Sequence, residues 1–182
     1  MSNHTGQPKT RRSSRFLRYC AAYSLMLALG TSGGANAETI SIDEHLTNAL
    51  RAYDGGHLET AWESWQLAAH AGSTDAMTSL ASMLERGEGL RPDARRAATW
   101  YRRAARLGDP IGQLNLGEMY LLGRGLKKDR GEAIFWLTLA GRGGNAWAAA
   151  KSLEAAQGLS STTVSTIQSR LRAWKPIAAS IR

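Results

Sequence analysis

Closely spaced glycines followed by a run of arginines are the part of this sequence that most suggests a chemical role. Gly87 and Gly89 flank a single residue, and the helix-forming run behind them holds five arginines, at Arg95, Arg96, Arg102, Arg103 and Arg106. Glycine-rich loops can hold phosphate groups, and a basic helix can bind nucleic acid. A Walker phosphate loop needs the motif G-x-x-x-x-G-K-[ST], and a dinucleotide-binding loop needs a preceding strand. The sequence has neither feature at these glycines. The glycines are therefore predicted to let a short loop turn with positive φ.

The other reactive side chains do not form patterns typical of catalysis or metal binding. His45, His57 and His70 are 12 and 13 residues apart, without the i,i+4 pair of a helical metal site. G-x-S-x-G occurs once, at residues 30–34 inside the N-terminal segment 1–37, and Ser-x-x-Lys does not occur. Six tryptophans have helical spacing and are predicted mostly to pack in the core, at Trp62, Trp65, Trp100, Trp136, Trp147 and Trp174. We expect no catalytic residue, no metal and no cofactor.

The N-terminus resembles a secretory signal peptide. Residues 1–37 combine five basic residues, no acidic residue and a short apolar run, and end in Ala35-Asn36-Ala37. The apolar run is too short for a transmembrane helix, which needs about 20 residues. We expect export, with cleavage after Ala37 and no transmembrane helix in the mature chain; retention as an uncleaved N-terminal anchor is the alternative.

Export would change the electrostatics of the protein. The whole chain has a formal charge of +8 and a pI of about 10.1, which suggests an acidic partner. Without residues 1–37 the charge is +3, from 18 basic and 15 acidic residues, and Cys20 is lost. The mature protein is therefore expected to have no disulfide and no affinity for nucleic acid.

A 36-residue repeat organises the chain. Residues 76–108 align without gaps on residues 112–144, with 11 of 33 positions identical, including both glycines, Asp93/Asp129 and Trp100/Trp136. Each unit predicts two helices with apolar residues at intervals of three and four. Gly72, Gly108 and Gly144 are expected to end second helices, while Ser73, Asp109 and Asn145 are expected to cap the next first helices.

The arginine stripe does not follow this repeat. Arg95, Arg96, Arg102 and Arg103 fall on one helix side, opposite the apolar residues. Their equivalents 36 residues later are Gly131, Glu132, Thr138 and Leu139. The stripe is therefore predicted to be a solvated face of one helix.

The pattern A-x-x-x-L-[AG]-x-x-[LY]-x-x-G-x-G-L-x-x-D-x-x-x-A-x-x-W-x-x-x-A-x-x-x-G resembles the Sel-1-like repeat, a longer relative of the tetratricopeptide repeat. The resemblance implies an all-α fold, an α-solenoid of helix–turn–helix units. We assign a degenerate repeat to residues 38–72, full repeats to 73–108 and 109–144, and a partial repeat with a capping helix to 145–176. Val164, Ile167, Leu171 and Trp174 form the apolar stripe of that capping helix.

The resemblance further implies a non-enzymatic adapter that binds a protein partner, here one exported to the bacterial periplasm. A groove lined by first helices is the expected contact surface. The candidate contact residues are the first-helix positions that packing leaves free, namely Thr78, Ser82, Glu85, Leu114, Asn115, Glu118 and Leu121.

Two alternatives remain at this point. Some disulfide-rich secreted members of the family are associated with penicillin binding and β-lactam hydrolysis, but the mature chain lacks cysteines. The second alternative is an envelope module that makes a weak contact with an anionic surface through Arg95, Arg102 and Arg106.

Overall fold

Helices of nearly equal length follow one another in the computed structural model, which describes residues 41–177. These residues form eight α-helices and no strand, which confirms the predicted all-α fold. The helices are α2 (Ile42–Asp54), α3 (Leu58–His70), α4 (Thr74–Arg86), α5 (Ala94–Arg106), α6 (Pro110–Leu122), α7 (Arg130–Arg142), α8 (Ala146–Ala156) and α9 (Ser161–Ala173). The predicted signal peptide and its cleavage site lie outside the described residues.

Local signals in the sequence set the helix boundaries. Ser73, Asp109 and Asn145 cap α4, α6 and α8, each accepting a hydrogen bond from the backbone N–H three residues later. Asp93 and Asp129 cap α5 and α7 in the same way. Each of these caps satisfies one of the N–H groups that a helix leaves without a partner. The caps predicted at Ser73, Asp109 and Asn145 are confirmed.

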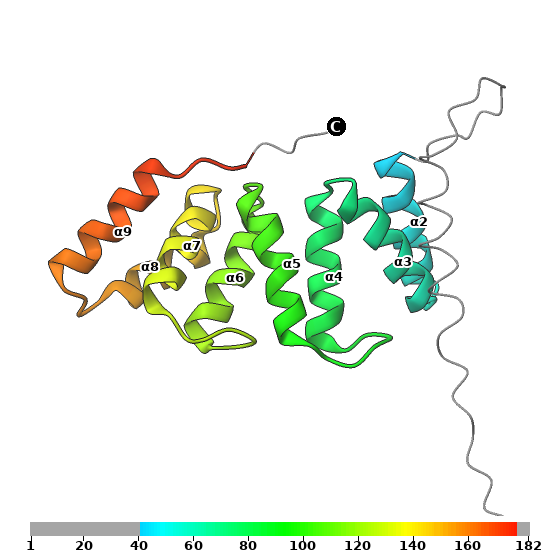
Figure 1. The fold of residues 1–182 in the computed structure, drawn as a ribbon, viewed down its shortest axis with the longest axis horizontal. Coiled ribbons are helices and arrows are strands. Elements are labelled where there is room, and N and C mark those ends of the chain that lie inside the picture. The colour runs from blue at the N-terminus through cyan, green and yellow to red at the C-terminus, as the bar shows by residue number, and fades with distance from the viewer. Residues whose placement is uncertain (1–40, 178–182) are drawn as a thin grey trace, which may run out of the picture. The chain divides into compact units, whose positions relative to one another are not determined.

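First and second helices pack in pairs, α2 with α3, α4 with α5 and α6 with α7, and each pair packs on the next (Figure 1). The pairs approach closely where the first helix carries a small residue. A Cβ at Gly117 would lie 2.7 Å from Cγ of Leu137, and its equivalent Ala81 is fully buried. Ala81 and Gly117 thus allow the paired helices to approach closely.

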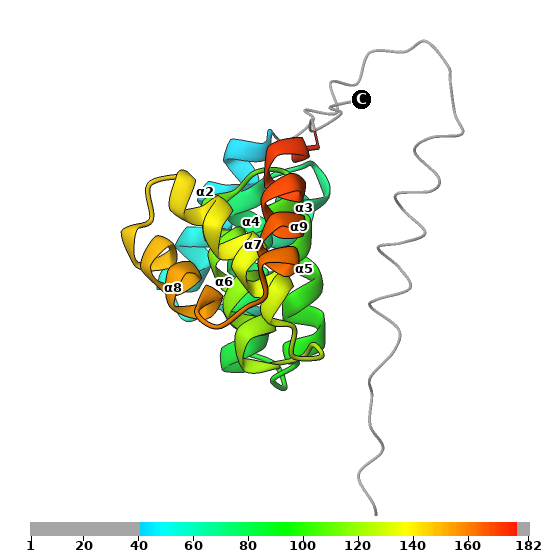
Figure 2. The same cartoon turned by 90° about the vertical axis from the view of Figure 1, so that its left-hand side faces the viewer.

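The helix α8 repeats the first helix of a unit but has no second helix packed on its outer side. At the position of Ala81 and Gly117 it carries Leu153, whose side chain is 72% exposed. The following helix α9 packs on α7 instead, and α8 and α9 lie on opposite sides of the row (Figure 2). A leucine at this position prevents the close approach that a small residue allows.

The helix α9 is the predicted terminal cap. Ser160 caps its N-terminus, and Ile167 and Leu171 are buried in the same apolar cluster as Trp136. Beyond α9 the chain continues to the end of α5, where the N–H of Ile177 donates to the carbonyl of Arg106 over 2.8 Å. The second-helix layer is therefore covered at its C-terminal end, as the sequence predicted.

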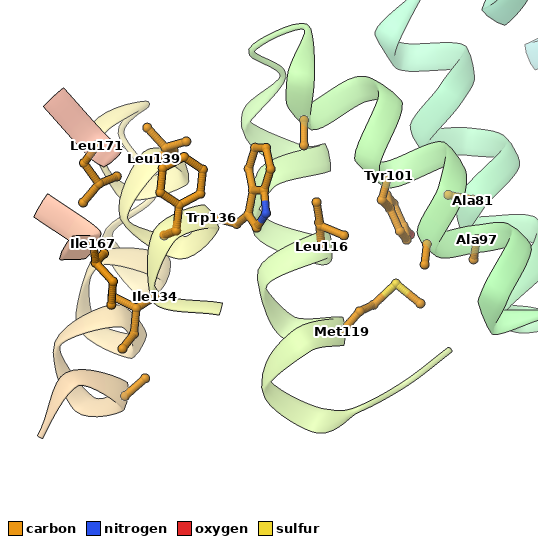
Figure 3. Close-up of a cluster of buried hydrophobic side chains, with 14 of the residues drawn as sticks. Ala81, Ala97, Tyr101, Leu116, Met119, Ile134, Trp136, Leu139, Ile167 and Leu171 are labelled. Carbon is orange, nitrogen blue, oxygen red and sulfur yellow. The ribbon is translucent and has the colours of Figure 1, made fainter. Parts of the chain in front are cut away.

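The two repeat tryptophans do not share one environment. Trp136 is 7% exposed and lies in the middle of the large apolar cluster, between Leu116 and Leu139 (Figure 3). Trp100 is only half-buried, and the guanidinium of Arg103 lies 4.7 Å from its ring centre. The neighbouring Tyr101 is buried instead. Trp100 packs, partly buried, against both apolar clusters, so the two equivalent tryptophans differ in how deeply they are buried.

Candidate partner-binding surface

The two G-x-G loops join each repeat to the one before it. The residue between the glycines reaches the end of the preceding first helix: Glu88 accepts a 3.0 Å hydrogen bond from the Tyr53 hydroxyl, and Arg124 lies 3.5 Å from the Glu85 carboxylate. Glu88 and Arg124 occupy equivalent loop positions, although the first makes a hydrogen bond and the second an ion pair. The middle residue of each loop thus makes an inter-repeat contact, a role that the sequence did not reveal.

The second glycine of each loop packs against the preceding second helix. A Cβ at Gly89 would lie 2.8 Å from Cβ of Leu58, and a Cβ at Gly125 would overlap the Ala94 carbonyl and lie 2.8 Å from the Arg95 nitrogen. Both glycines also have positive φ, 70° and 65°. The predicted turn is confirmed, and the glycines serve packing as well as turning.

A polar network connects the two helices that carry the predicted contact residues, α4 and α6, with α5 and the second G-x-G loop. The Tyr101 hydroxyl donates to Glu85 over 3.0 Å, and Arg124 lies 3.5 Å from both Glu85 and Glu118. Glu85 and Glu118 come from successive first helices, α4 and α6. Arg124 therefore holds two predicted contact residues in fixed positions across a repeat boundary.

The environment of Tyr101 predicts a change of stability at alkaline pH. Burial raises the pKa of Tyr101 well above its ordinary value of 10.0, and the charge and hydrogen bond of Glu85 raise it further. A pKa raised by folding means that the tyrosine stabilises the fold fully below pH 10 and loses this effect as pH rises through the folded pKa. The Tyr101→Phe variant has no phenolic proton to lose, so its stability lacks this dependence on pH.

We therefore expect the wild-type advantage in free energy of unfolding over Tyr101→Phe to shrink above pH 10. The slope is at most about 1.4 kcal/mol per pH unit, the value for one proton. Urea unfolding at half-unit steps from pH 8 to 11 measures it. A constant difference between the two proteins across that range would contradict the prediction.

The predicted contact residues lie on first helices but differ in how much surface they offer. Ser82, Asn115 and Glu118 are half-buried and lie on the exposed sides of α4 and α6. Leu114 and Leu121 turn inward and pack against the cluster of Leu137, Ala140 and Ala148. Whether these residues contact a partner stays a prediction.

Thr78 offers little surface to a partner. Thr78 is only 9% exposed, and its hydroxyl donates a hydrogen bond to the backbone oxygen of Asp75 over 3.0 Å. Its equivalent on α6 is Leu114, which is partly buried. This position therefore contributes more to packing than the sequence suggested.

A stripe of exposed positions on the first helices passes through the better exposed candidates. On α6 it consists of Ile111, Asn115, Glu118 and Leu122, spaced by four, three and four residues, which places them on one helix face. Ile111 and Leu122, at its ends, are 54% and 62% exposed. We call this set and its equivalents the first-helix stripe; they are Asp75, Ser79, Ser82 and Arg86 on α4, and Trp147, Lys151 and Glu154 on α8.

The apolar members of this stripe were not among the predicted contact residues. Ile111 and Trp147 are one repeat apart and could have been found by their register, since Asp75 shows that the position is polar in the preceding unit. Trp147 is 47% exposed and has the Lys151 ammonium 5.8 Å from its ring centre. It is therefore a surface tryptophan and not a core one.

The arginines of α5 divide into two groups. Arg95, Arg96, Arg103 and Arg106 are exposed, whereas Arg102 is half-buried and donates to the Tyr120 hydroxyl over 3.2 Å. Within residues 41–177, no three His, Cys, Asp or Glu side chains lie close enough together to hold a metal ion. The same residues include no helix with the length and apolar character needed to cross a membrane.

Comparison with known proteins matches both the sequence pattern and the fold. The Sel1 repeat family model matches residues 74–109 and 110–145. A Sel1 repeat protein from Oxalobacter formigenes is 26% identical, with a TM-score of 0.56 over 76% of this chain and 93% of its own. Among curated proteins, none matches this sequence.

Two further structures share the fold. The first is c5321, a protective antigen present in uropathogenic Escherichia coli strains, which is 23% identical with a TM-score of 0.67 over 75% of this chain. This chain spans only 30% of the length of c5321. The second, Helicobacter pylori cysteine rich protein B, is 21% identical with a TM-score of 0.50 over 64% of this chain and 98% of its own.

Sel1 repeat proteins generally act as non-enzymatic scaffolds for protein–protein interaction. The repeat register, the helix pairs, the family match and the shared solenoid fold agree with one another. Residues 74–145 therefore match two Sel1 repeats, and the described chain shares the solenoid fold of the Sel1 repeat proteins to which it is similar.

Proposed function

We propose that this protein is a non-enzymatic scaffold of the bacterial cell envelope that binds a protein partner through the first-helix stripe. The observation that carries the proposal is the exposure of large apolar side chains on this stripe, Ile111, Leu122 and Trp147, beside charged and amide groups. Exposed apolar residues rimmed by polar ones are typical of protein interaction sites. The envelope location rests on the signal-peptide pattern of residues 1–37.

The stripe changes character along the solenoid, which bears on the partner. On α4 it is polar and charged, with Asp75, two serines and Arg86, whereas on α6 and α8 it carries Ile111, Leu122 and Trp147. The partner is therefore expected to place its apolar anchor over α6 and α8 and polar groups over α4. Central apolar anchors surrounded by polar contacts carry most of the affinity in protein interfaces.

Bulky charged side chains on the first-helix stripe should weaken partner binding. We expect the double variant Ser82→Arg, Asn115→Arg to weaken binding at least tenfold, because each arginine obstructs a surface that must pack closely. The partner is first captured from envelope extracts with the tagged protein, and its affinity is then measured with purified components by calorimetry.

A matched control separates this surface from the rest of the protein. Ser165→Arg with Gln168→Arg adds the same charges at exposed positions of α9. This control is expected to bind as the wild type does, with both doubles melting normally. Equal binding by the two double variants would rule out the stripe as the contact surface.

The hydrolase alternative has a direct test. Within residues 41–177 no three His, Cys, Asp or Glu side chains gather closely enough to hold a metal ion, and Ser-x-x-Lys does not occur in the sequence. We expect the purified protein to hydrolyse nitrocefin no faster than buffer does. Sustained turnover that survives repurification would overturn the non-enzymatic function.

A further inference from the structure

The outward sides of α3 and α5 carry opposite charges near the N-terminal end of each helix. Glu59 and Glu63 are exposed on α3, and Arg95 and Arg96 are exposed on α5. Glu59 and Arg95 are one repeat apart, so they occupy equivalent positions on the second helices of successive units. We call the two outward sides together the α3–α5 face.

These charges have no ionic partner within the described part of the chain. None of the four takes part in an ion pair between residues 41 and 177. The face also contains apolar surface, because Leu67 is 45% exposed and the half-buried Trp62 has the Arg96 guanidinium 5.7 Å from its ring centre. The face therefore combines acidic, basic and apolar parts.

The equivalent side of α7 already binds a helix. Phe135 and Leu139 of α7 correspond to Glu63 and Leu67 of α3, and both are buried in the cluster that includes Ile167 and Leu171 of α9. An ion pair of 2.7 Å between Arg170 and Glu132 accompanies this contact. The outward side of a second helix in this solenoid is thus a surface that can receive a helix through apolar contact and one ion pair.

We propose that the α3–α5 face binds the same face of a second copy of this chain in a two-fold symmetric dimer. A two-fold axis parallel to these helices brings α3 of each copy onto α5 of the other without reversing the helix direction. The glutamates at the start of α3 then meet Arg95 and Arg96 at the start of α5, twice in each dimer. The same patch serves both copies, because it holds both charges.

Charge complementarity favours a second copy over an unrelated acidic partner. An acidic partner would satisfy the arginines of α5 but would repel Glu59 and Glu63 on the adjoining part of the same face. A second copy satisfies both sets. The dimer leaves the first-helix stripe open, so the two surfaces can be tested separately.

Sedimentation velocity tests the dimer. The purified protein is expected to sediment as a dimer in about 50 mM NaCl at tens of micromolar and to dissociate in about 500 mM NaCl, where charge attraction is screened. The acidic variant Arg95→Glu, Arg96→Glu and the basic variant Glu59→Lys, Glu63→Lys should each be monomeric, with at least a tenfold higher dissociation constant.

Mixing the two variants gives the decisive result. In a one-to-one mixture the all-acidic face meets the all-basic face on both sides of the two-fold axis, so a heterodimer should form at low salt. Lys127→Glu with Lys128→Glu, exposed in the α6–α7 loop, is the control and should dimerise as the wild type does.

The outcomes separate this proposal from its competitors. A wild-type protein that stays monomeric at low salt overturns it, including when that monomer sediments with anionic phosphatidylglycerol vesicles. Dimers that persist in both charge variants place the interface elsewhere and also overturn it. Because partner binding is measured on the first-helix stripe, failure here leaves the proposed function standing.

Discussion

Replacing Trp136 with alanine is expected to lower the free energy of unfolding by about 3–5 kcal/mol. The indole is 7% exposed, and its ring lies edge-on to Phe135 at a centroid distance of 5.0 Å. Its removal leaves a cavity among side chains from α6, α7 and neighbouring helices (Figure 3), which a solenoid of two full repeats cannot refill.

The equivalent substitution in the preceding repeat provides the comparison. Trp100 is half-buried and is contacted by Arg103 and His70, so Trp100→Ala is expected to cost only about 1–3 kcal/mol. Urea unfolding followed by far-UV circular dichroism measures both variants under the same conditions. Equal losses, or a larger loss for Trp100→Ala, would show that the burial difference between the repeats has no energetic consequence.

Replacing Gly125 with alanine is expected to cost about 2–5 kcal/mol, because two effects add. A residue with a side chain costs about 1–2 kcal/mol at a φ of 65°. The new methyl group would also overlap the Ala94 carbonyl at the start of α5, and overpacking of this kind costs about 1–3 kcal/mol. The backbone of a helix cannot move aside as a flexible side chain can, so little of this cost is relieved.

Other glycines of the chain separate the two effects. Gly158 has a φ of 73°, and no neighbouring atom lies within 4 Å of the place that an alanine methyl group would take, so Gly158→Ala should cost only about 1–2 kcal/mol from backbone strain. A methyl group at Gly89 would meet the Leu58 side chain, so Gly89→Ala should lie between the two. Thermal unfolding of the three variants tests this order. If Gly125→Ala and Gly158→Ala melt at the same temperature, the inter-repeat contact of Gly125 contributes nothing.

The candidate surface could be predicted in part. Helical periodicity marks the first-helix positions that packing leaves free, and Ser82, Asn115 and Glu118 do lie on the first-helix stripe. Thr78 satisfies the same rule but is buried, whereas Ile111 and Leu122 are exposed although apolar residues are expected in the core. Periodicity gives the side of a helix, but the exposed fraction at a helix edge depends on the neighbouring helices.

The role of the G-x-G loops shows the same limit. The turn of each loop could be predicted from its two glycines, the aspartate that follows them, and the recurrence of the same pattern 36 residues later. The contacts of Glu88 with Tyr53 and of Arg124 with Glu85 span 35 and 39 residues, and the paired chemistry differs between repeats. No residue identity recurs at these positions, so the repeat alignment carries no signal for them.

Residue types along the chain were sufficient to predict the helices, their caps, their turns and the repeat that stacks them. These features depend on hydrogen bonds and backbone angles within a few residues, which residue type controls directly. Three outcomes needed the packed fold: which of two equivalent tryptophans is buried, where α9 packs, and that Leu153 faces outward on α8. Those outcomes depend on which helix lies next to a given position, and a terminal repeat lacks the neighbour that an internal repeat has.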